Sequence, residues 1–255
     1  FGAAVVQEVV SAANLNGVYG IALSPDGQHL YAANYSDASI AVFSRSGADG
    51  KLTFVEKLKQ AVSGVDGLSG VFRVAVSPDG ASVYSAAFDG SAVAAFSRSV
   101  GTGKLSFLAA YKNGSGGLTK LSAATSVAVG PDGAHVFATG YSGNSVAVFD
   151  RDATTGLLEL NQEILRSPAS GAPANPALAG GRDIALSPDG ATAYVSAFSD
   201  NAVVTLKAPN PVPVIESLKP SSATAGGPAF TLEVLGSGFL PSSSVRWNGS
   251  ARFTT

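Results

Sequence analysis

Charged side chains stand directly before two apolar segments of this chain, and they are its first candidates for chemistry. Arg73 precedes Val-Ala-Val, and Arg182 and Asp183 precede Ile-Ala-Leu, although only 13% of the 255 residues are charged. Two guanidinium groups can hold a carboxylate or phosphate through paired hydrogen bonds, and a nearby carboxylate can serve as a general base. We therefore take Arg73, Arg182, Asp183 and the equivalent Tyr19 as candidate ligand-binding residues, with Asp183 as the candidate catalytic base. In the alternative interpretation these residues form an Arg–Asp ion pair that fills the interior of the fold and binds no ligand.

Histidine occurs twice, as His29 and His135, each two residues after a turn glycine. One interpretation is a metal-binding or acid–base pair. We favour the other, in which two polar residues lie at the exposed starts of separate strands. The chain has no cysteine, which excludes disulfides, zinc thiolate sites and cysteine nucleophiles. We expect no metal and no cofactor.

These residues belong to an internal repeat. A Pro-Asp-Gly turn follows an apolar triplet at Pro25, Pro78, Pro131 and Pro188, so the repeat spacings are 53, 53 and 57 residues. The residue before proline caps a type I turn, proline presets its φ angle, and glycine suits its fourth position. The turn aspartates are expected to bond local backbone rather than to form a carboxylate cluster: Asp26, Asp79, Asp132 and Asp189.

Each period divides into short apolar strands separated by turns, without helical periodicity. Many strands are apolar on both faces, such as residues 40–43, so the sheet that they form must be covered on both sides. Four-stranded blades arranged around an axis meet that requirement, and alanine at the same position of each first strand suits a crowded centre. We predict an all-β protein with a β-propeller segment at residues 1–208. A β-sandwich is the structural runner-up. The candidate residues would then lie at the mouth of the central channel.

The repeat resembles a known family. Ser-Pro-Asp-Gly, Tyr-x-Ala, Ser39-Ile-Ala-Val-Phe-Ser-Arg45 and Gly-x-Leu are similar to the lactonase-like, YVTN-type propellers, over roughly residues 4–207. The resemblance implies a seven-bladed ring and 6-phosphogluconolactonase-like hydrolysis of a sugar lactone. It also implies a histidine-containing segment ahead of the inner strand. Here residues 17–19, 70–72 and 180–182 contain no histidine.

The C-terminal part differs in composition. Residues 209–213 form a proline-rich linker. Residues 214–255 resemble the start of an IPT/TIG domain, through Pro220, Gly226-Gly227, Gly236-Ser-Gly-Phe239 and Trp247-Asn-Gly249. We expect an incomplete immunoglobulin-like β-sandwich here, because such domains need about 100 residues.

We also expect the chain to be a fragment of a larger propeller, with a four-bladed or shared ring as the alternative. Residues 4–10 have the pattern of an outermost strand, and the last repeat lacks one after Leu206. Pairing of residues 4–10 with 202–207 would favour the closed ring. The unfinished blade and the IPT-like edges could pair with another copy in a homo-oligomer.

Our first functional interpretation is a secreted or surface-exposed, non-catalytic binding or structural module. Its expected partner is a protein, a carbohydrate or a small anionic ligand at the channel mouth. The alternatives are a sugar-lactone hydrolase and a subunit of an extracellular filament or coat. The net charge of −2 argues against nucleic acid as a partner, and no apolar run approaches the roughly 18 residues of a membrane span.

Overall fold

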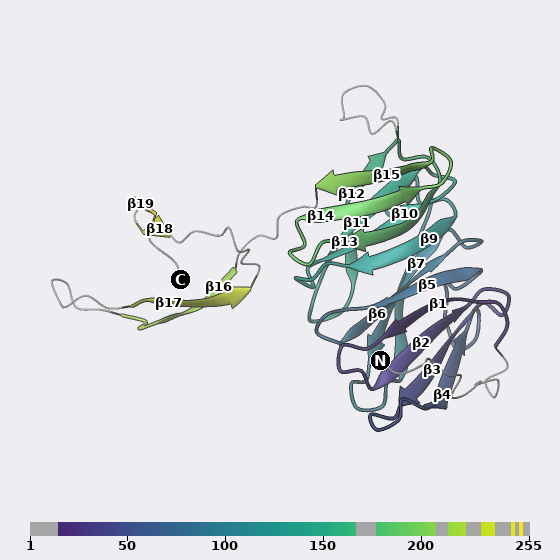
Figure 1. The fold of residues 1–255 in the computed structure, drawn as a ribbon, viewed down its shortest axis with the longest axis horizontal. Helices are drawn as coiled ribbons and strands as arrows, with labels where there is room; N and C mark the ends of the chain where they lie inside the picture. Colours follow the sequence, from purple (N-terminus) through teal and green to yellow (C-terminus); the bar gives the residue numbers. More distant parts are fainter. Residues whose placement is uncertain are drawn as a thin grey trace, which may run out of the picture.

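The computed structural model describes residues 15–166, 177–207, 214–222, 231–237, 246–247 and 250–251. In these ranges the strands are joined by turns and loops, and no helix occurs, as predicted (Figure 1). Consequently, no helix in these ranges has the length and apolar character to cross a membrane.

Fifteen strands form four successive blades. Blade 1 contains β1 (Val18–Leu23), β2 (His29–Asn34), β3 (Ser39–Arg45) and β4 (Leu52–Lys59). Blade 2 contains β5 (Val71–Val76), β6 (Ser82–Ala87), β7 (Ala92–Arg98) and β8 (Leu105–Lys112). Blade 3 contains β9 (Ala124–Val129), β10 (His135–Gly140), β11 (Ser145–Arg151) and β12 (Leu158–Leu165). Blade 4 contains β13 (Gly181–Leu186), β14 (Thr192–Ala197) and β15 (Ala202–Lys207).

Within each blade the strands are antiparallel and follow chain order. Three blades have the four strands expected, and the fourth has three described strands. The expected pairing of residues 4–10 falls outside the described residues. The inner strands β1, β5, β9 and β13 lie beside one another in order, and blades 1 and 4 lie at opposite ends of the row (Figure 1).

The chain after blade 4 is described only in short pieces. β16 (Val214–Lys219) pairs with β17 (Glu233–Ser237), and β18 (Arg246–Trp247) pairs with β19 (Ser250–Ala251). The proline-rich linker at 209–213 lies outside the described residues. The immunoglobulin-like sandwich remains a prediction.

The hydrophobic core lies between the blades rather than within one sheet. Tyr31, Ile40 and Val42 of blade 1 pack with Val74 and Phe96 of blade 2. Two further clusters join blade 2 to blade 3 and blade 3 to blade 4. Each inner blade is therefore covered on both faces, which is what strands apolar on both sides require.

The turn aspartates have the local role that was predicted, together with a second one. In blade 1 the Ser24 carbonyl accepts the Gly27 amide at 2.8 Å, and Asp26 Oδ1 accepts the Gln28 amide at 2.9 Å. The other oxygen of Asp26 accepts a hydrogen bond from Arg98 of blade 2, at 2.9 Å. Hydrogen bonds from Ser24, from the Gln28 amide and from Arg98 hold the pKa of Asp26 well below its usual range.

Arg98 joins blade 2 to blade 1 in an arrangement that we call the arginine clasp. Its guanidinium donates to the Tyr31 hydroxyl at 2.7 Å, to Asp26 at 2.9 Å and to the Gly80 carbonyl of its own blade at 2.9 Å. Arg151 forms the same clasp between blades 3 and 2. It donates to the Tyr84 hydroxyl at 2.9 Å, to Asp79 at 2.8 Å and to the Gly133 carbonyl of its own blade at 3.0 Å. Both arginine side chains are 1% exposed. The clasp is therefore an ion pair between a buried arginine and a more exposed aspartate, repeated with the period of the sequence.

The two histidines are buried, so their expected exposure is wrong. His29 is 3% exposed and His135 is 9% exposed. His29 is covered because the turn of blade 2 packs against it: a Cβ added to Gly103 would lie 2.2 Å from the His29 ring, and Arg98 Nη2 lies 2.9 Å from its Nδ1. His135 lies in blade 3, between Asp132 at 3.4 Å and Asp150 at 3.5 Å. The two histidines therefore lie in separate blades, and each packs among residues of the fold.

Candidate functional site

One backbone feature recurs at the start of every inner strand. The residue before the strand has a left-handed φ angle of 66° at Gly17, 64° at Gly70, 55° at Ala123 and 65° at Gly180. Its carbonyl accepts the amide of an aromatic residue that follows the second strand of the same blade. The four bonds are Tyr35 to Gly17 at 2.8 Å, Phe88 to Gly70 at 2.9 Å, Tyr141 to Ala123 at 3.0 Å and Phe198 to Gly180 at 2.9 Å. The repeat thus fixes one aromatic ring per blade on the face where the inner strands begin, which we call the mouth face.

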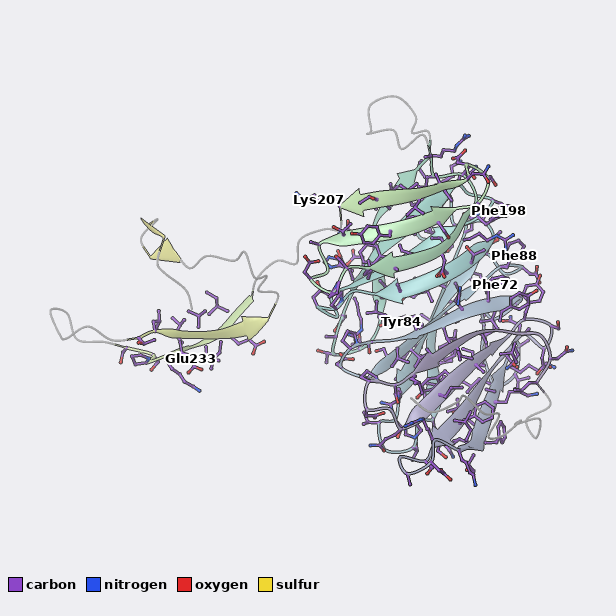
Figure 2. All side chains as sticks on the ribbon, in the orientation of Figure 1. Phe72, Tyr84, Phe88, Phe198, Lys207 and Glu233 are labelled. Atoms are coloured by element: carbon purple, nitrogen blue, oxygen red, sulfur yellow. The ribbon has the colours of Figure 1, made fainter. Side chains whose placement is uncertain are left out.

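The rings on the mouth face contact one another from blade to blade. Tyr19 stacks on Phe72 with centroids 4.4 Å apart, and Phe72 lies 6.2 Å from Phe88. Phe88 lies 6.2 Å from Tyr141, and Tyr141 lies 6.5 Å from Phe198. Figure 2 shows Phe72 and Phe88 of blade 2 and Phe198 of blade 4 on the same side of the row of blades. We call the set of six rings the aromatic arc: Tyr19, Tyr35, Phe72, Phe88, Tyr141 and Phe198.

Arg182 adds a positive charge to one end of the aromatic arc. Its guanidinium carbon lies 4.9 Å from the centroid of Tyr141 and 5.0 Å from that of Phe198. Both contacts are cation–π interactions, which hold the guanidinium plane while its N–H groups still face solvent. Phe198 is 61% exposed and Tyr19, near the other end, is 58% exposed. The arc is therefore open to a ligand.

Asp183 connects three blades beside the arc. Its Oδ2 accepts from Arg73 of blade 2 at 2.8 Å, and its Oδ1 accepts from the Ser126 hydroxyl of blade 3 at 2.7 Å. The Ile184 amide donates to the same Oδ1 at 3.1 Å. The side chains of Arg73 and Asp183 are 39% and 52% exposed, so the pair is solvated and adds little to stability.

The four candidate residues are thus distributed over two features of one face. Tyr19 lies in the aromatic arc and Arg182 at its end, whereas Arg73 and Asp183 pair with each other. The two arginines hold different partners, so they do not form a single guanidinium clamp in this arrangement. Among the described residues, no three His, Asp or Glu side chains gather as a metal site would require.

The sequence reasoning missed most of the arc. Tyr35, Phe88, Tyr141 and Phe198 occupy one repeat position, and a column of aromatic residues at the end of the second strand was a usable signal. Blade 3 interrupts the column formed by Tyr19 and Phe72. There Thr125 is fully buried and donates to the Gly181 carbonyl at 2.7 Å.

Comparison with protein families identifies the repeat. The family model described as "Lactonase, 7-bladed beta-propeller" matches residues 5–119 and, in an overlapping alignment, residues 57–179. The chain belongs to this family. The family description gives its propeller seven blades, and the structure of this lactonase-family chain describes four.

Solved structures share the fold of this lactonase-family chain. A protein of Bacteroides uniformis provisionally assigned as a 6-phosphogluconolactonase is 18% identical, with a TM-score of 0.60 over 74% of this chain and 50% of its own. A similarly assigned protein of Bacteroides fragilis is 21% identical, with a TM-score of 0.58 over 74% and 50%. The periplasmic gluconolactonase of Pseudomonas aeruginosa is 20% identical, with a TM-score of 0.58 over 74% and 49%. The chain spans about half the length of these structures, and at this identity they show the fold alone. Comparison with curated proteins gave no match.

Proposed function

We propose that this chain is a binding module for a carbohydrate that carries a carboxylate or a phosphate, taken at the mouth face. The observation that carries the proposal is the aromatic arc with Arg182 at its end. Aromatic rings pack against the apolar C–H faces of sugar rings, and an aligned guanidinium recognises an anionic oxygen pair.

The polar residues beside the arc suit the same kind of ligand. Arg73, Ser126 and Asp183 supply hydrogen-bond donors and acceptors that already form a connected network. Sugar hydroxyls donate and accept at once, so they can join such a network without leaving a group unpaired. A neutral apolar ligand would gain nothing from these three side chains or from Arg182.

Calorimetric titration tests the proposal with 6-phosphogluconate, gluconate and glucose as probes. We expect binding in the order 6-phosphogluconate, gluconate, glucose, weakening with added salt because the guanidinium contributes charge. Arg182→Ala should remove the preference for the charged ligands. Equal binding of glucose and gluconate, or absence of binding at millimolar concentration, would reject the proposal.

Lactone hydrolysis is the second candidate function, and family membership favours it. Asp183 would act as the base that activates water, and Arg73 and Arg182 would hold the anionic group of a sugar lactone. Against this role, both oxygens of Asp183 already accept hydrogen bonds from Arg73, Ser126 and the Ile184 amide. We expect no hydrolysis of 6-phosphogluconolactone above the spontaneous rate. Turnover that Asp183→Asn abolishes would promote this candidate over the first.

Secretion or surface exposure is part of the first proposal, with an IPT/TIG-like segment as spacer. A subunit of an extracellular filament or coat is the remaining alternative. Support for both comes from the resemblance of residues 214–255 to that domain, for which the described pairs β16–β17 and β18–β19 give short antiparallel ribbons. Fractionation of cells that make the native protein, followed by immunoblotting, tests the location.

A further inference from the structure

A groove of about 420 Å³ lies at the outer rim, between blades 1 and 2. The outermost strands β4 and β8 and the loop at 62–65 form its walls, and we call it the rim groove. Its volume falls within the roughly 300–1,000 Å³ of small-molecule pockets. Both walls belong to adjacent described blades, so the opening does not depend on the ends of the row. None of the residues that line the groove belongs to the aromatic arc.

The equivalent place between blades 2 and 3 holds a tyrosine side chain. Tyr111 of β8 packs against the core between those blades, and its hydroxyl accepts the Leu158 amide at 2.7 Å. Leu58 holds the same repeat position in β4, and it has neither the ring nor the hydroxyl. The equivalent amide, that of Leu105 in the wall of the rim groove, donates instead to Glu56 at 2.7 Å. The groove is therefore open where the next pair of blades has a phenol ring.

The loops that border the two places show the same difference. They close with equivalent backbone hydrogen bonds, so their paths are alike. A Cβ added at Gly117, between blades 2 and 3, would lie 3.6 Å from Leu160. One added at the equivalent Gly64 would meet no atom within 4 Å, and the neighbouring Val62 is 52% exposed. The rim groove is thus open because no side chain fills it, and not because its loop is displaced.

Two residues of this loop hold strained backbone. Ala61 and Ser63 have left-handed φ angles of 62° and 52°. The equivalent residues between blades 2 and 3 are Gly114 and Gly116, and glycine adopts such angles freely. Non-glycine residues held in this region cluster at ligand-binding sites. The strain is therefore a second observation, independent of the volume, that points to a ligand at the rim groove.

The side chains around the groove define the chemistry of its occupant. Phe107 forms part of the wall, and an aromatic ring can stack on it. The two lysines of the lining already pair with Asp37, Lys57 at 2.8 Å and Lys59 at 2.7 Å. The carboxylate of Glu56 lies where the hydroxyl end of the ring would come, so it favours a hydrogen-bond donor and disfavours an anion.

We propose that the rim groove binds a small uncharged phenol, whose ring takes the place that Tyr111 fills between blades 2 and 3. The ring packs on Phe107, and its hydroxyl donates to the carboxylate of Glu56. The site is separate from the mouth face, and it stands whether or not that face binds a carbohydrate.

A titration of the whole chain with p-cresol, followed by ligand-observed NMR, tests this site. p-Cresol is the phenol that matches a tyrosine side chain, and we expect saturable binding at millimolar concentration. 4-Methylbenzoate has a carboxylate in place of the hydroxyl, so it should bind about tenfold more weakly or worse, because its charge faces Glu56.

Leu58→Tyr should weaken p-cresol binding by about tenfold or more, because it places in blade 1 the side chain that blade 2 already accommodates. Lys51→Tyr is the matched control: it adds the same residue to blade 1 at an exposed turn outside the groove, and binding should not change. Phe107→Leu, which introduces the residue of blade 3, removes the stacking wall and keeps the groove open. It should weaken binding about threefold or more, and it is the second variant if Leu58→Tyr does not fold.

Three results would overturn the proposal. One is the absence of saturable p-cresol binding up to about 10 mM, well above the concentration at which a millimolar ligand saturates. Another is equal binding of p-cresol by the unmodified chain and by folded Leu58→Tyr, or of p-cresol and 4-methylbenzoate by the unmodified chain. The third is loss of p-cresol binding in Phe198→Ala but not in Phe107→Leu, which would assign the phenol to the aromatic arc.

Discussion

The Nε atom of Arg98 donates to the hydroxyl of Tyr31 over 2.7 Å, across the boundary between two blades and 67 residues of sequence. Arg151 and Tyr84 repeat the bond with the same separation of 67 residues. An identical separation means that one blade-to-blade geometry is used twice. The repeat therefore encodes the contacts between blades as well as the blades themselves.

Arg98→Ala should destabilise the chain strongly. The substitution leaves the Asp26 carboxylate without its Arg98 donor and the Tyr31 hydroxyl with only the Gly103 carbonyl, at a cost of about 1.5–3 kcal/mol. Arg45→Ala changes the same repeat position but removes one bond to a carbonyl, at a cost of about 1 kcal/mol or less. Urea denaturation at low protein concentration measures both. If both variants lose a similar free energy of unfolding, the clasp does not have the stabilising role described.

Gly103→Ala should cost more than Gly50→Ala. Both glycines have left-handed φ angles, 71° and 77°, so each substitution loses about 1 kcal/mol of backbone energy. At Gly103 the new Cβ would also meet the ring of His29 at 2.2 Å, whereas at Gly50 the nearest atom is Arg45 Nη2 at 3.7 Å. Overpacking adds about 1–3 kcal/mol at Gly103 alone. Equal melting temperatures for the two variants would show that the turn does not press on His29.

The two histidines should titrate on opposite sides of their ordinary pKa of 6.5. Burial, and then the charge of Arg98, lower the pKa of His29, whereas the hydrogen bond to Asp132 raises the pKa of His135. The chain has no other histidine, so two imidazole signals in an NMR titration suffice. Asp132→Asn should lower the pKa of His135 and leave that of His29 unchanged. Two signals with pKa values on the same side of 6.5 would refute this assignment.

Stability should depend on pH through these same groups. The lowered pKa of His29 means that the unfolded chain binds a proton more readily, so its contribution to stability is lost as the pH falls below about 6.5. The raised pKa of His135 has the opposite sign: its contribution is complete below about 6.5 and is lost as the pH rises through the folded value. His29→Ser, which places the residue of blade 2 in blade 1, should remove the acid-side loss. Urea denaturation midpoints measured between pH 5 and 8 check this expectation. If His29→Ser leaves the fall of the midpoint at acid pH unchanged, the role of His29 is contradicted.

Phe198→Ala should weaken binding of 6-phosphogluconate by about tenfold, or about 1.4 kcal/mol, since it removes an exposed ring against which the sugar would pack. It also removes one of the two rings that hold Arg182. Phe54→Ala is the matched control, because Phe54 is an exposed ring on β4, away from the arc. Calorimetry of both variants decides whether the arc, rather than any exposed ring, contacts the ligand.

The blades were predictable because the residues that define each strand and turn lie close together in the sequence, within one repeat. The Pro-Asp-Gly turns and the apolar triplets recur with a period close to 53 residues, and that pattern alone favours four-stranded blades over a sandwich. Burial of His29 was not predictable in this way, because the residues that cover it, Arg98 and Gly103, come from the next repeat. A histidine two residues after a turn looks exposed when only its own blade is considered.

The candidate site was predictable in place but not in pairing. Comparison of equivalent repeat positions brought Tyr19, Arg73, Arg182 and Asp183 to one face. The alternative interpretation of an Arg–Asp pair did not specify that Arg73, 110 residues away, would be the partner of Asp183. Nor did the comparison show that Arg182 would lie over two rings. Those contacts depend on the rotation from one blade to the next, which no single repeat contains.

Among the described residues, blades 3 and 4 are joined without an arginine clasp. Phe137 replaces the tyrosine in blade 3, and the sequence has Ala208 at the position of the arginine. In a linear array, stability is approximately the sum of unit terms and nearest-neighbour terms, so opening begins at the weakest coupling. We therefore expect blade 4 to be the first cooperative unit to unfold, and the amides of β13–β15 to exchange with deuterium before those of β5–β7. The thermodynamic consequence would be three tightly coupled units and a looser fourth.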